Sequence, residues 1–274
     1  MRHGSTLPGF GLSLSILIAA LSVVVLLPLG ALLGRGVIMG PAEVLGHLGS
    51  TRVMSALALS FRAAFVASVI NLVFGVILAW VLTRYRFPGR RLIDAAVDLP
   101  FALPTAVAGI ALTALYAPNG AFGRMLEPLG IRVAYTETGI WLALIFVGLP
   151  FVVRTVQPVI EEIDPEWEEA SATLGASRVR TLRRVVLPVL SPALLTGFAL
   201  ALARSVGEYG SVIFIAGNLP RQTEIAPLLI VIRLEEYNYD GAAAIGLAML
   251  AISFAMLVVI NSAQVWSRRR IGHV

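Results

Sequence analysis

The stretch GIWLALIFVGLPFVVRTVQPVI occupies residues 139–160 and carries one charged side chain, that of Arg154. A helix of about 20 apolar residues is long enough to cross roughly 30 Å of hydrocarbon. The stretch is therefore predicted to be a membrane-spanning helix. Comparable apolar runs recur along the chain, at 14–33, 56–82, 93–116, 192–216 and 242–266.

The composition agrees with a membrane protein. Hydrophobic residues make up 58% and charged residues 14% of the chain, and the mean hydropathy is +0.86. Soluble domains carry about 25% charged residues, so a water-soluble core is excluded. The predicted fold class is an all-α membrane protein with six transmembrane helices. There is no Cys, and His3, His47 and His273 show no metal-ligand spacing, so we expect no metal site.

The positive charge indicates topology rather than nucleic-acid binding. All 21 basic residues are Arg, giving a formal net charge of +5. They gather in the second-to-third loop, the fourth-to-fifth loop and the C-terminal tail, at residues 84–91, 178–184 and 268–270. Even numbers of spans separate these segments, so all three lie on one side. The positive-inside rule predicts that this side, with both termini, is cytoplasmic.

The N-terminal run has two interpretations. Arg2 followed by the apolar residues 12–27 is typical of a secretory signal, but residues 28–30 offer no good cleavage site. Because more spans follow, we expect an uncleaved anchor. The predicted division is an N-terminal helix and outer loop, 1–53, followed by a core transmembrane domain, 54–274. No internal repeat is visible, so a second subunit would have to supply the other half of a two-halved transporter.

Two prolines interrupt the third run. Pro100 and Pro104 cannot continue an undisturbed helix, so we expect a break there. A broken helix would expose backbone amides to a pore, although kinks that serve packing explain the prolines almost as well. Asp94 and Asp98 are expected to act as caps or loop partners.

The loop from about 161 to 188 contains a short helix signal. Asp164 suits an N-cap, Pro165 the first helical position and Gly175 the residue that ends the helix. One face would carry Trp167, Ala170, Ser171 and Leu174. Such a helix either packs on its own bundle or inserts into a groove on another protein, and the pattern leaves both possibilities open. A basic segment, 177–186, is expected to stop at Leu187-Pro188, with the fifth span starting at 191–192.

This loop resembles the EAA loop of permeases of ATP-binding-cassette importers. The family pattern is E-A-A, three residues, G, nine residues and I-x-L-P, and the matching residues are Glu169, Ala170, Ser171, Gly175, Val185, Leu187 and Pro188. Ser171 for Ala and Val185 for Ile are the departures. In that family the loop is the coupling helix that docks into the ATPase. The resemblance therefore implies that Trp167, Glu169 to Ser171, Leu174, Gly175, Leu187 and Pro188 couple the chain to an ATPase.

Further segments resemble sulfate/thiosulfate permeases of the T-subunit type. They are TRYRFPGR at 83–90, DLPFALPTAVAG at 98–109, PFVVRTVQP at 150–158 and GEYGSVIFIAGN at 207–218. Molybdate permeases share much of this signature, so another oxyanion is the alternative substrate. The resemblance implies a type I importer architecture with these partners: a homologous second permease, an ATPase dimer that binds ATP and Mg²⁺, and an extracytoplasmic sulfate-binding protein.

Charges within the predicted spans mark a candidate substrate path. Arg204 and Glu208 stand four residues apart near the middle of the fifth run, where a charge costs about 3 kcal/mol to insert. They form either a local ion pair or an oxyanion path in which the Arg204 guanidinium supplies donors. Arg62 and Pro104 are further candidates, although Arg62 could equally snorkel to the outer surface. Arg154 is expected to reach cytoplasmic partners or the acidic loop.

The sequence argues against an enzyme. It contains no G-x-S-x-G elbow, no H-E-x-x-H pair, no Cys nucleophile and no phosphate-binding G-x-x-x-x-G-K-[ST] loop. A membrane-embedded enzyme is thus a remote alternative, and ATP hydrolysis is expected in a separate subunit. A purely structural anchor would need neither the Arg204 and Glu208 pair nor the EAA-like loop.

Overall fold

The computed structural model describes residues 10–271, and the side chains of these residues except Pro165 and residues 265–271. Every regular element in this range is helical. Six helical stretches are long and apolar enough to cross a membrane: Phe10–Leu48, Thr51–Arg84, Thr105–Leu129, Glu137–Glu162, Arg178–Val206 and Tyr239–Gln264. The predicted all-α fold with six spanning helices is confirmed.

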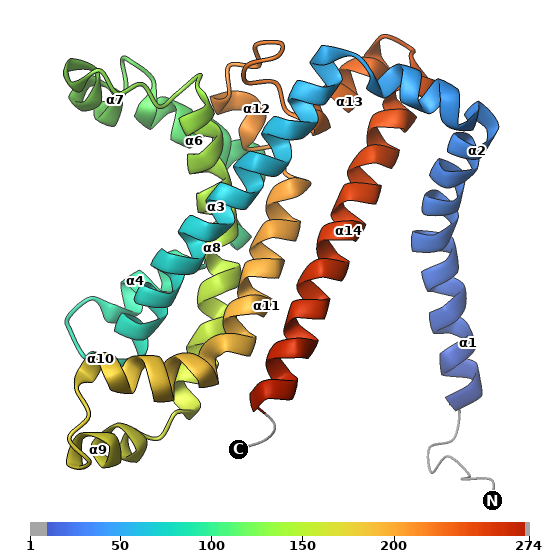
Figure 1. Cartoon of the computed structure of the whole chain (residues 1–274). Helices are drawn as coiled ribbons and strands as arrows, with labels where there is room; N and C mark the ends of the chain where they lie inside the picture. Colours follow the sequence, from blue (N-terminus) through green and yellow to red (C-terminus); the bar gives the residue numbers. More distant parts are fainter. Residues whose placement is uncertain (1–9, 272–274) are drawn as a thin grey trace, which may run out of the picture.

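The first span lies beside the bundle. α1 (Phe10–Leu21) continues through a π-helical turn, Ser22–Leu26, into α2 (Leu27–Leu48), so it is longer than the predicted run 14–33. Figure 1 shows α1 standing apart from the other helices. α2 bends at Gly40, which precedes Pro41 and has a left-handed φ of 76°. α2 packs against α14 (Tyr239–Ile271).

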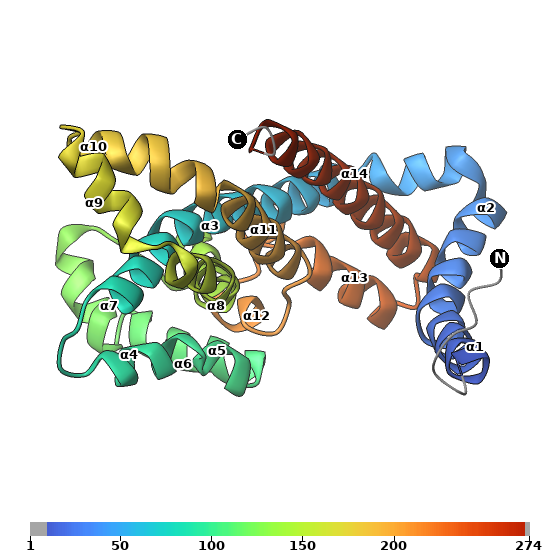
Figure 2. The ribbon, with the colours of Figure 1, turned by 90° about the horizontal axis from the view of Figure 1, so that it is seen from below.

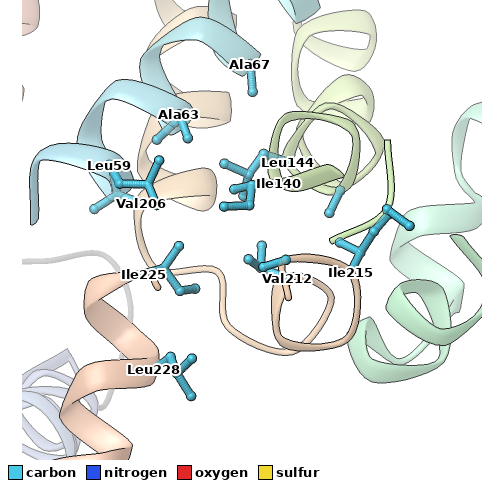
Figure 3. Close-up of a cluster of buried hydrophobic side chains, with 14 of the residues drawn as sticks. Leu59, Ala63, Ala67, Ile140, Leu144, Val206, Val212, Ile215, Ile225 and Leu228 are labelled. Atoms are coloured by element: carbon cyan, nitrogen blue, oxygen red, sulfur yellow. The ribbon is translucent and has the colours of Figure 1, made fainter. Parts of the chain in front are cut away.

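Three helices form the core: α3 (Thr51–Arg84), α8 (Glu137–Glu162) and α11 (Leu187–Val206). Small residues let them approach closely, since a Cβ added to Gly75 of α3 would meet Val152 of α8 at 2.8 Å. Figure 3 shows one core cluster, in which Leu59 and Ala63 of α3 face Ile140 and Leu144 of α8. This packing holds the segments that follow α8 and α11 in place.

The third run is broken as predicted. It forms α4 (Arg90–Val97), α5 (Leu99–Ala102) and α6 (Thr105–Tyr116), and the chain is extended at Leu103 and Pro104. α6 is followed by α7 (Ala121–Leu126) and a 3-10 turn, Glu127–Leu129. The spanning stretch therefore begins at Thr105, and α4 and α5 form a separate amphipathic segment.

The predicted end of the fifth run, at residue 216, is wrong. α11 ends at Val206, and the chain continues through a loop into α12 (Val212–Ile215) and α13 (Ala226–Glu235). Apolar residues resume at 212–216 and lengthen the run, but the buried carboxylate of Glu208 binds the backbone of Ser211 and turns the chain before them. The helix end is thus fixed by a contact that hydropathy does not reveal.

The helices place two groups of segments at opposite ends of the bundle. In Figure 1, α4, α9 (Pro165–Thr173) and α10 (Arg178–Thr181) lie at the end that also holds the start of α1 and the end of α14, and Figure 2 looks at the molecule from that end. α7, α12 and α13 lie at the other end. The arginine-rich segments 84–91 and 178–184 therefore share one end, as the sequence predicts.

Candidate functional site

α9 forms from local signals, as predicted. The Asp164 carboxylate accepts a hydrogen bond from the Glu166 amide at 3.0 Å, and Pro165 occupies the first turn. Gly175 has a φ of 77°, a left-handed conformation that suits glycine after a helix. No atom lies within 4 Å of a Cβ built there, so the backbone conformation alone calls for glycine.

The apolar face of α9 is exposed. Trp167 is 50% exposed and Leu174 88% exposed, so these side chains do not pack into the bundle of their own chain. Val179 and Leu182, which follow on the α10 side, are also exposed. Glu169 and Ala170 lie exposed beside them, whereas Ser171 is half-buried and its Oγ lies 2.7 Å from the Thr181 Oγ1. We define residues 167–182 as the α9–α10 ledge.

Arg84, at the end of α3, fixes the ledge to the bundle. Its Nη2 lies 3.1 Å from a carboxylate oxygen of Glu168 in α9 and donates to the carbonyl of Ile163 at 3.0 Å. Its guanidinium also lies 5.5 Å from the centre of the Trp80 ring, a cation–π contact. Arg84 thus connects α9, and Ile163 just ahead of it, to the end of α3.

The segment after α10 does not stop at Leu187-Pro188, so that prediction is wrong. Helix runs from Arg178 to Val206, through a π-helical turn at Leu182–Val186. The wider turn ends two residues before Pro188, which lacks an amide hydrogen, and it lets the helix continue past the proline. Leu187 and Pro188 are exposed at the start of α11. The α10 part of the ledge and α11 thus form one continuous helix.

Arg204 and Glu208 pair at the far end of that element. Arg204 lies in the last turn of α11, and Glu208 directly follows the C-cap Gly207, so the predicted position in mid-span is wrong. The Arg204 Nη1 donates to the Glu208 Oε2 at 2.5 Å, and their side chains are 33% and 2% exposed. Among the described contacts only Nη1 is engaged, so Nε and Nη2 keep hydrogens for another acceptor.

Glu208 also organises the loop that follows it, residues 207–211, which we call the Gly-Glu loop. Its Oε1 accepts hydrogen bonds from the Ser211 amide at 2.8 Å and from the Ser211 Oγ at 2.9 Å. α6 packs directly on this loop, because a Cβ on Gly109 would meet the Ser211 Cα at 2.8 Å. A Cβ added to Gly210 would likewise collide with the side chain of Thr105. The break at Pro104 therefore sets the start of a helix that touches the Gly-Glu loop.

Arg62 belongs to a different ion pair. It donates from Nε and Nη2 to the two oxygens of Glu137, at 3.1 and 2.7 Å, and its side chain is 63% exposed. Glu137 begins α8. Within the part of the chain that the structure describes, no contact joins Arg62 to Arg204. The structure thus brings Arg204, Glu208 and the residue after Pro104 to one region, and leaves Arg62 outside it.

Of the two kinds of partner predicted for Arg154, the structure shows residues at the end of the neighbouring run and not the acidic loop. It binds Asp94 and Asp98, with donor–acceptor distances of 2.7 to 2.8 Å. The two aspartates therefore serve as partners of a spanning helix rather than as caps. A second pair, Arg52 with the buried Glu224, is bidentate at 2.6 and 2.8 Å. Sequence reasoning missed it, since the two residues stand 172 positions apart.

Comparisons with known proteins agree with this arrangement. A family model described as a binding-protein-dependent transport system inner membrane component matches residues 71–273. A sulfate transport system permease protein CysT from Salmonella typhimurium is 51% identical over 268 residues, covering 97% of each chain. The CysT protein of Escherichia coli K12 is 50% identical over the same length, again covering 97% of each chain.

The fold is found in solved transporter structures. A bacterial alginate ABC transporter, solved with a periplasmic protein bound to an alginate pentasaccharide, matches with a TM-score of 0.76, 18% identity and coverage of 96% of this chain and 94% of that chain. At this identity the likeness shows the fold alone, that of a type I importer permease. Together with the family match, it shows that the chain belongs to the family of binding-protein-dependent transport system inner membrane components.

Proposed function

We propose that this chain is the membrane-spanning permease subunit of an ATP-driven importer that carries sulfate, and with it thiosulfate, across the cytoplasmic membrane. The observation that carries the proposal is half-identity over 97% of the chain to proteins named as sulfate transport permeases. Those relatives are transporter subunits, and we assign this chain no enzymatic activity of its own.

The α9–α10 ledge is the proposed docking site for the ATPase. Trp167 and Leu174 expose apolar surface at the same end as the arginine-rich segments, and an exposed amphipathic helix suits a groove on another protein. Glu169, Ala170, Ser171, Gly175, Leu187 and Pro188 are the further coupling residues that we propose. ATP and Mg²⁺ would be bound by that ATPase, and this end of the bundle would face the cytoplasm with both termini.

The ledge is also suited to transmit force. Arg84 ties it to α3, and the continuous helix from Arg178 to Val206 ties it to the Gly-Glu loop. A rigid-body shift of the ledge would thus move Arg204 and Glu208 at the other end of α11. Alternation between outward and inward openings follows from such a shift between this chain and a homologous second permease.

The substrate path is proposed to run past Arg204. Its unengaged Nε and Nη2 offer donors to an oxyanion, while the ion pair with Glu208 lowers its net attraction and so favours release. Thr105 begins α6 directly after Pro104 and borders the same loop. Arg62, paired with Glu137, is a more distant member of the proposed path. High-affinity capture would be left to an extracytoplasmic sulfate-binding protein.

Uptake of labelled sulfate by proteoliposomes tests the proposal. The vesicles contain the whole complex of two permeases and the ATPase dimer, with binding protein outside and ATP inside. We expect ATP-dependent sulfate accumulation that excess molybdate does not suppress. Vesicles without ATP are the control. Equal suppression by molybdate at matched concentrations would contradict the choice of sulfate, and absence of ATP-dependent uptake would contradict an importer.

A further inference from the structure

A basic pocket lies at the turn between α3 and α4, among the residues that follow Arg84. Its volume is about 500 Å³, and it is lined by Arg86, Phe87, Gly89, Arg90, Arg91 and Asp94. Three of these residues are arginines, so the pocket gathers guanidinium groups within a short segment. None of these lining residues belongs to the α9–α10 ledge or to the Gly-Glu loop.

The backbone of a tight turn brings these arginines together. The Arg90 amide donates to the Phe87 carbonyl at 3.4 Å, and Gly89 has φ 84° and ψ −2°. With Pro88 at the second position, this is a type II turn, in which the third position needs the left-handed conformation of glycine. Arg86 precedes the turn and Arg90 and Arg91 follow it, so the turn folds three cations toward one space.

These cations lack partners within the part of the chain that the structure describes. Neighbouring Arg84 pairs with Glu168, but Arg86, Arg90 and Arg91 make no side-chain hydrogen bond or ion pair there. The acidic side chain in the pocket is Asp94, and its Oδ1 already accepts from the Arg154 Nη1 at 2.7 Å. The pocket therefore carries net positive charge and suits an anion whose oxygens accept several charge-assisted hydrogen bonds.

The surface beside the pocket is apolar. Leu92 is 76% exposed, and Leu99 and Phe101 are half exposed, on the segment that leads from the pocket. A free oxyanion would engage the guanidinium groups but leave these side chains in water. A basic, amphipathic segment at the end of a spanning helix has the character of an element that lies in the membrane interface. Acyl chains would cover the apolar side chains while a headgroup occupies the pocket.

We propose that Arg86, Arg90 and Arg91 bind the phosphate of an anionic phospholipid in this pocket. The site is connected to the ledge by short paths: Arg84 stands two residues before Arg86, and Asp94 is held by Arg154 of α8, which leads to α9. A bound headgroup would therefore steady the segment that directly follows Arg84, the residue that holds Glu168. This proposal does not depend on which anion the transporter carries.

Native mass spectrometry of the purified full chain with phosphatidylglycerol tests the site. We expect one phosphatidylglycerol to be retained, and phosphatidylcholine not to replace it. The triple variant Arg86→Gln, Arg90→Gln, Arg91→Gln is expected to bind phosphatidylglycerol at least about tenfold more weakly, because each charge-assisted hydrogen bond is worth about a factor of ten. The matched control is Arg178→Gln, Arg180→Gln, Arg183→Gln, which removes the same charge at the same end but outside the pocket, and it is expected to retain the lipid.

Equal loss in both variants would show attraction by general charge and overturn the site. Displacement of the lipid by millimolar inorganic phosphate would overturn the choice of a phospholipid. A phosphatidylglycerol carrying a photoreactive headgroup provides a test on the unmodified chain, and we expect its label within residues 86–94. In the complete transporter, labelling that persists supports the proposal, whereas its disappearance once the ATPase is bound would assign the pocket to a protein interface instead.

Discussion

Arg154 of α8 holds Asp98, at the junction of α4 and α5, through two parallel hydrogen bonds: Nε donates to Oδ1 at 2.8 Å and Nη2 donates to Oδ2 at 2.7 Å. The same guanidinium donates to the side chain of Asp94 at 2.7 Å and to its carbonyl at 2.8 Å. One side chain thus attaches the amphipathic segment to the core helix that leads to the ledge.

Replacing Arg154 with Leu is expected to lower the free energy of unfolding by about 1–2 kcal/mol. The lost bonds are charge-assisted and bidentate, but Asp94 and Asp98 are 40% and 49% exposed and stay hydrated. Thermal unfolding of the purified chain in detergent, followed by Trp fluorescence, measures the change. Arg233→Leu, which removes an exposed pair with Glu236, is the control, and a loss of equal size there would contradict the special role of Arg154.

The spanning helices could be predicted because the length of an apolar run is itself the signal. The break at Pro100 and Pro104 was also predictable, because proline lacks the amide hydrogen that a helix interior needs. The end of α11 was not, because apolar residues resume at Val212 and lengthen the run, and the turn depends on Glu208 binding Ser211. The short helices α12 and α13 follow from that turn and escaped prediction with it.

The candidate site likewise has features that the sequence predicts and features that it does not. The cap at Asp164 and the left-handed Gly175 are signals within one short segment, and they predict α9 correctly. The partners of Arg154 and Arg52 stand 56 and 172 residues away, and no periodicity in one sequence indicates such pairs. The exposure of Trp167 shows that this side chain does not pack into its own bundle, and it depends on the packing of the whole bundle.

Glu224→Gln is expected to destabilise the chain by roughly 2–4 kcal/mol. Glu224 is 1% exposed and engages Arg52 through both oxygens, so the substitution leaves a partly buried guanidinium without its counter-charge. Because Arg52 is about one-third exposed, the cost stays below that of a fully buried pair. Chemical denaturation in mild detergent provides the measurement. Glu236→Gln, at a 47% exposed carboxylate, should cost under about 1 kcal/mol, and a similar loss at both sites would refute the distinction.

Gly175→Val is expected to uncouple ATP hydrolysis from transport. The Gly175 φ of 77° is costly for a β-branched residue, so the substitution would reshape the end of α9 at a position where an added Cβ meets no atom within 4 Å. The ratio of sulfate imported to ATP hydrolysed in proteoliposomes is the measurement. Gly175→Asn is the matched control, because asparagine tolerates the left-handed region. Normal coupling in the Val variant would contradict the proposed role of α9 in transmitting force from the ATPase.

Gly109→Ala is expected to reduce sulfate uptake while leaving the chain in the membrane. An added methyl group would collide with the backbone of Ser211, so α6 or the Gly-Glu loop must shift. Gly34→Ala adds the same methyl group on α2, where no atom lies within 4 Å, and uptake there should remain normal. Uptake per assembled complex is compared for the two variants. If both keep full activity, the contact between α6 and the loop is not needed for transport.

The double variant Arg204→Gln, Glu208→Gln separates a substrate role from a structural one. Arg204→Ala alone should reduce flux, but it would also leave the buried Glu208 carboxylate without its cation. The two glutamines can retain a neutral hydrogen bond, and the Glu208→Gln side chain can still accept from Ser211, so the loop is expected to keep its fold. If Arg204 attracts the oxyanion, sulfate flux should fall at least about tenfold, since a charge-assisted bond is worth about 1.5–3 kcal/mol, while the unfolding temperature changes little. Unchanged flux with unchanged stability would instead make the Arg204–Glu208 pair a structural feature of the Gly-Glu loop.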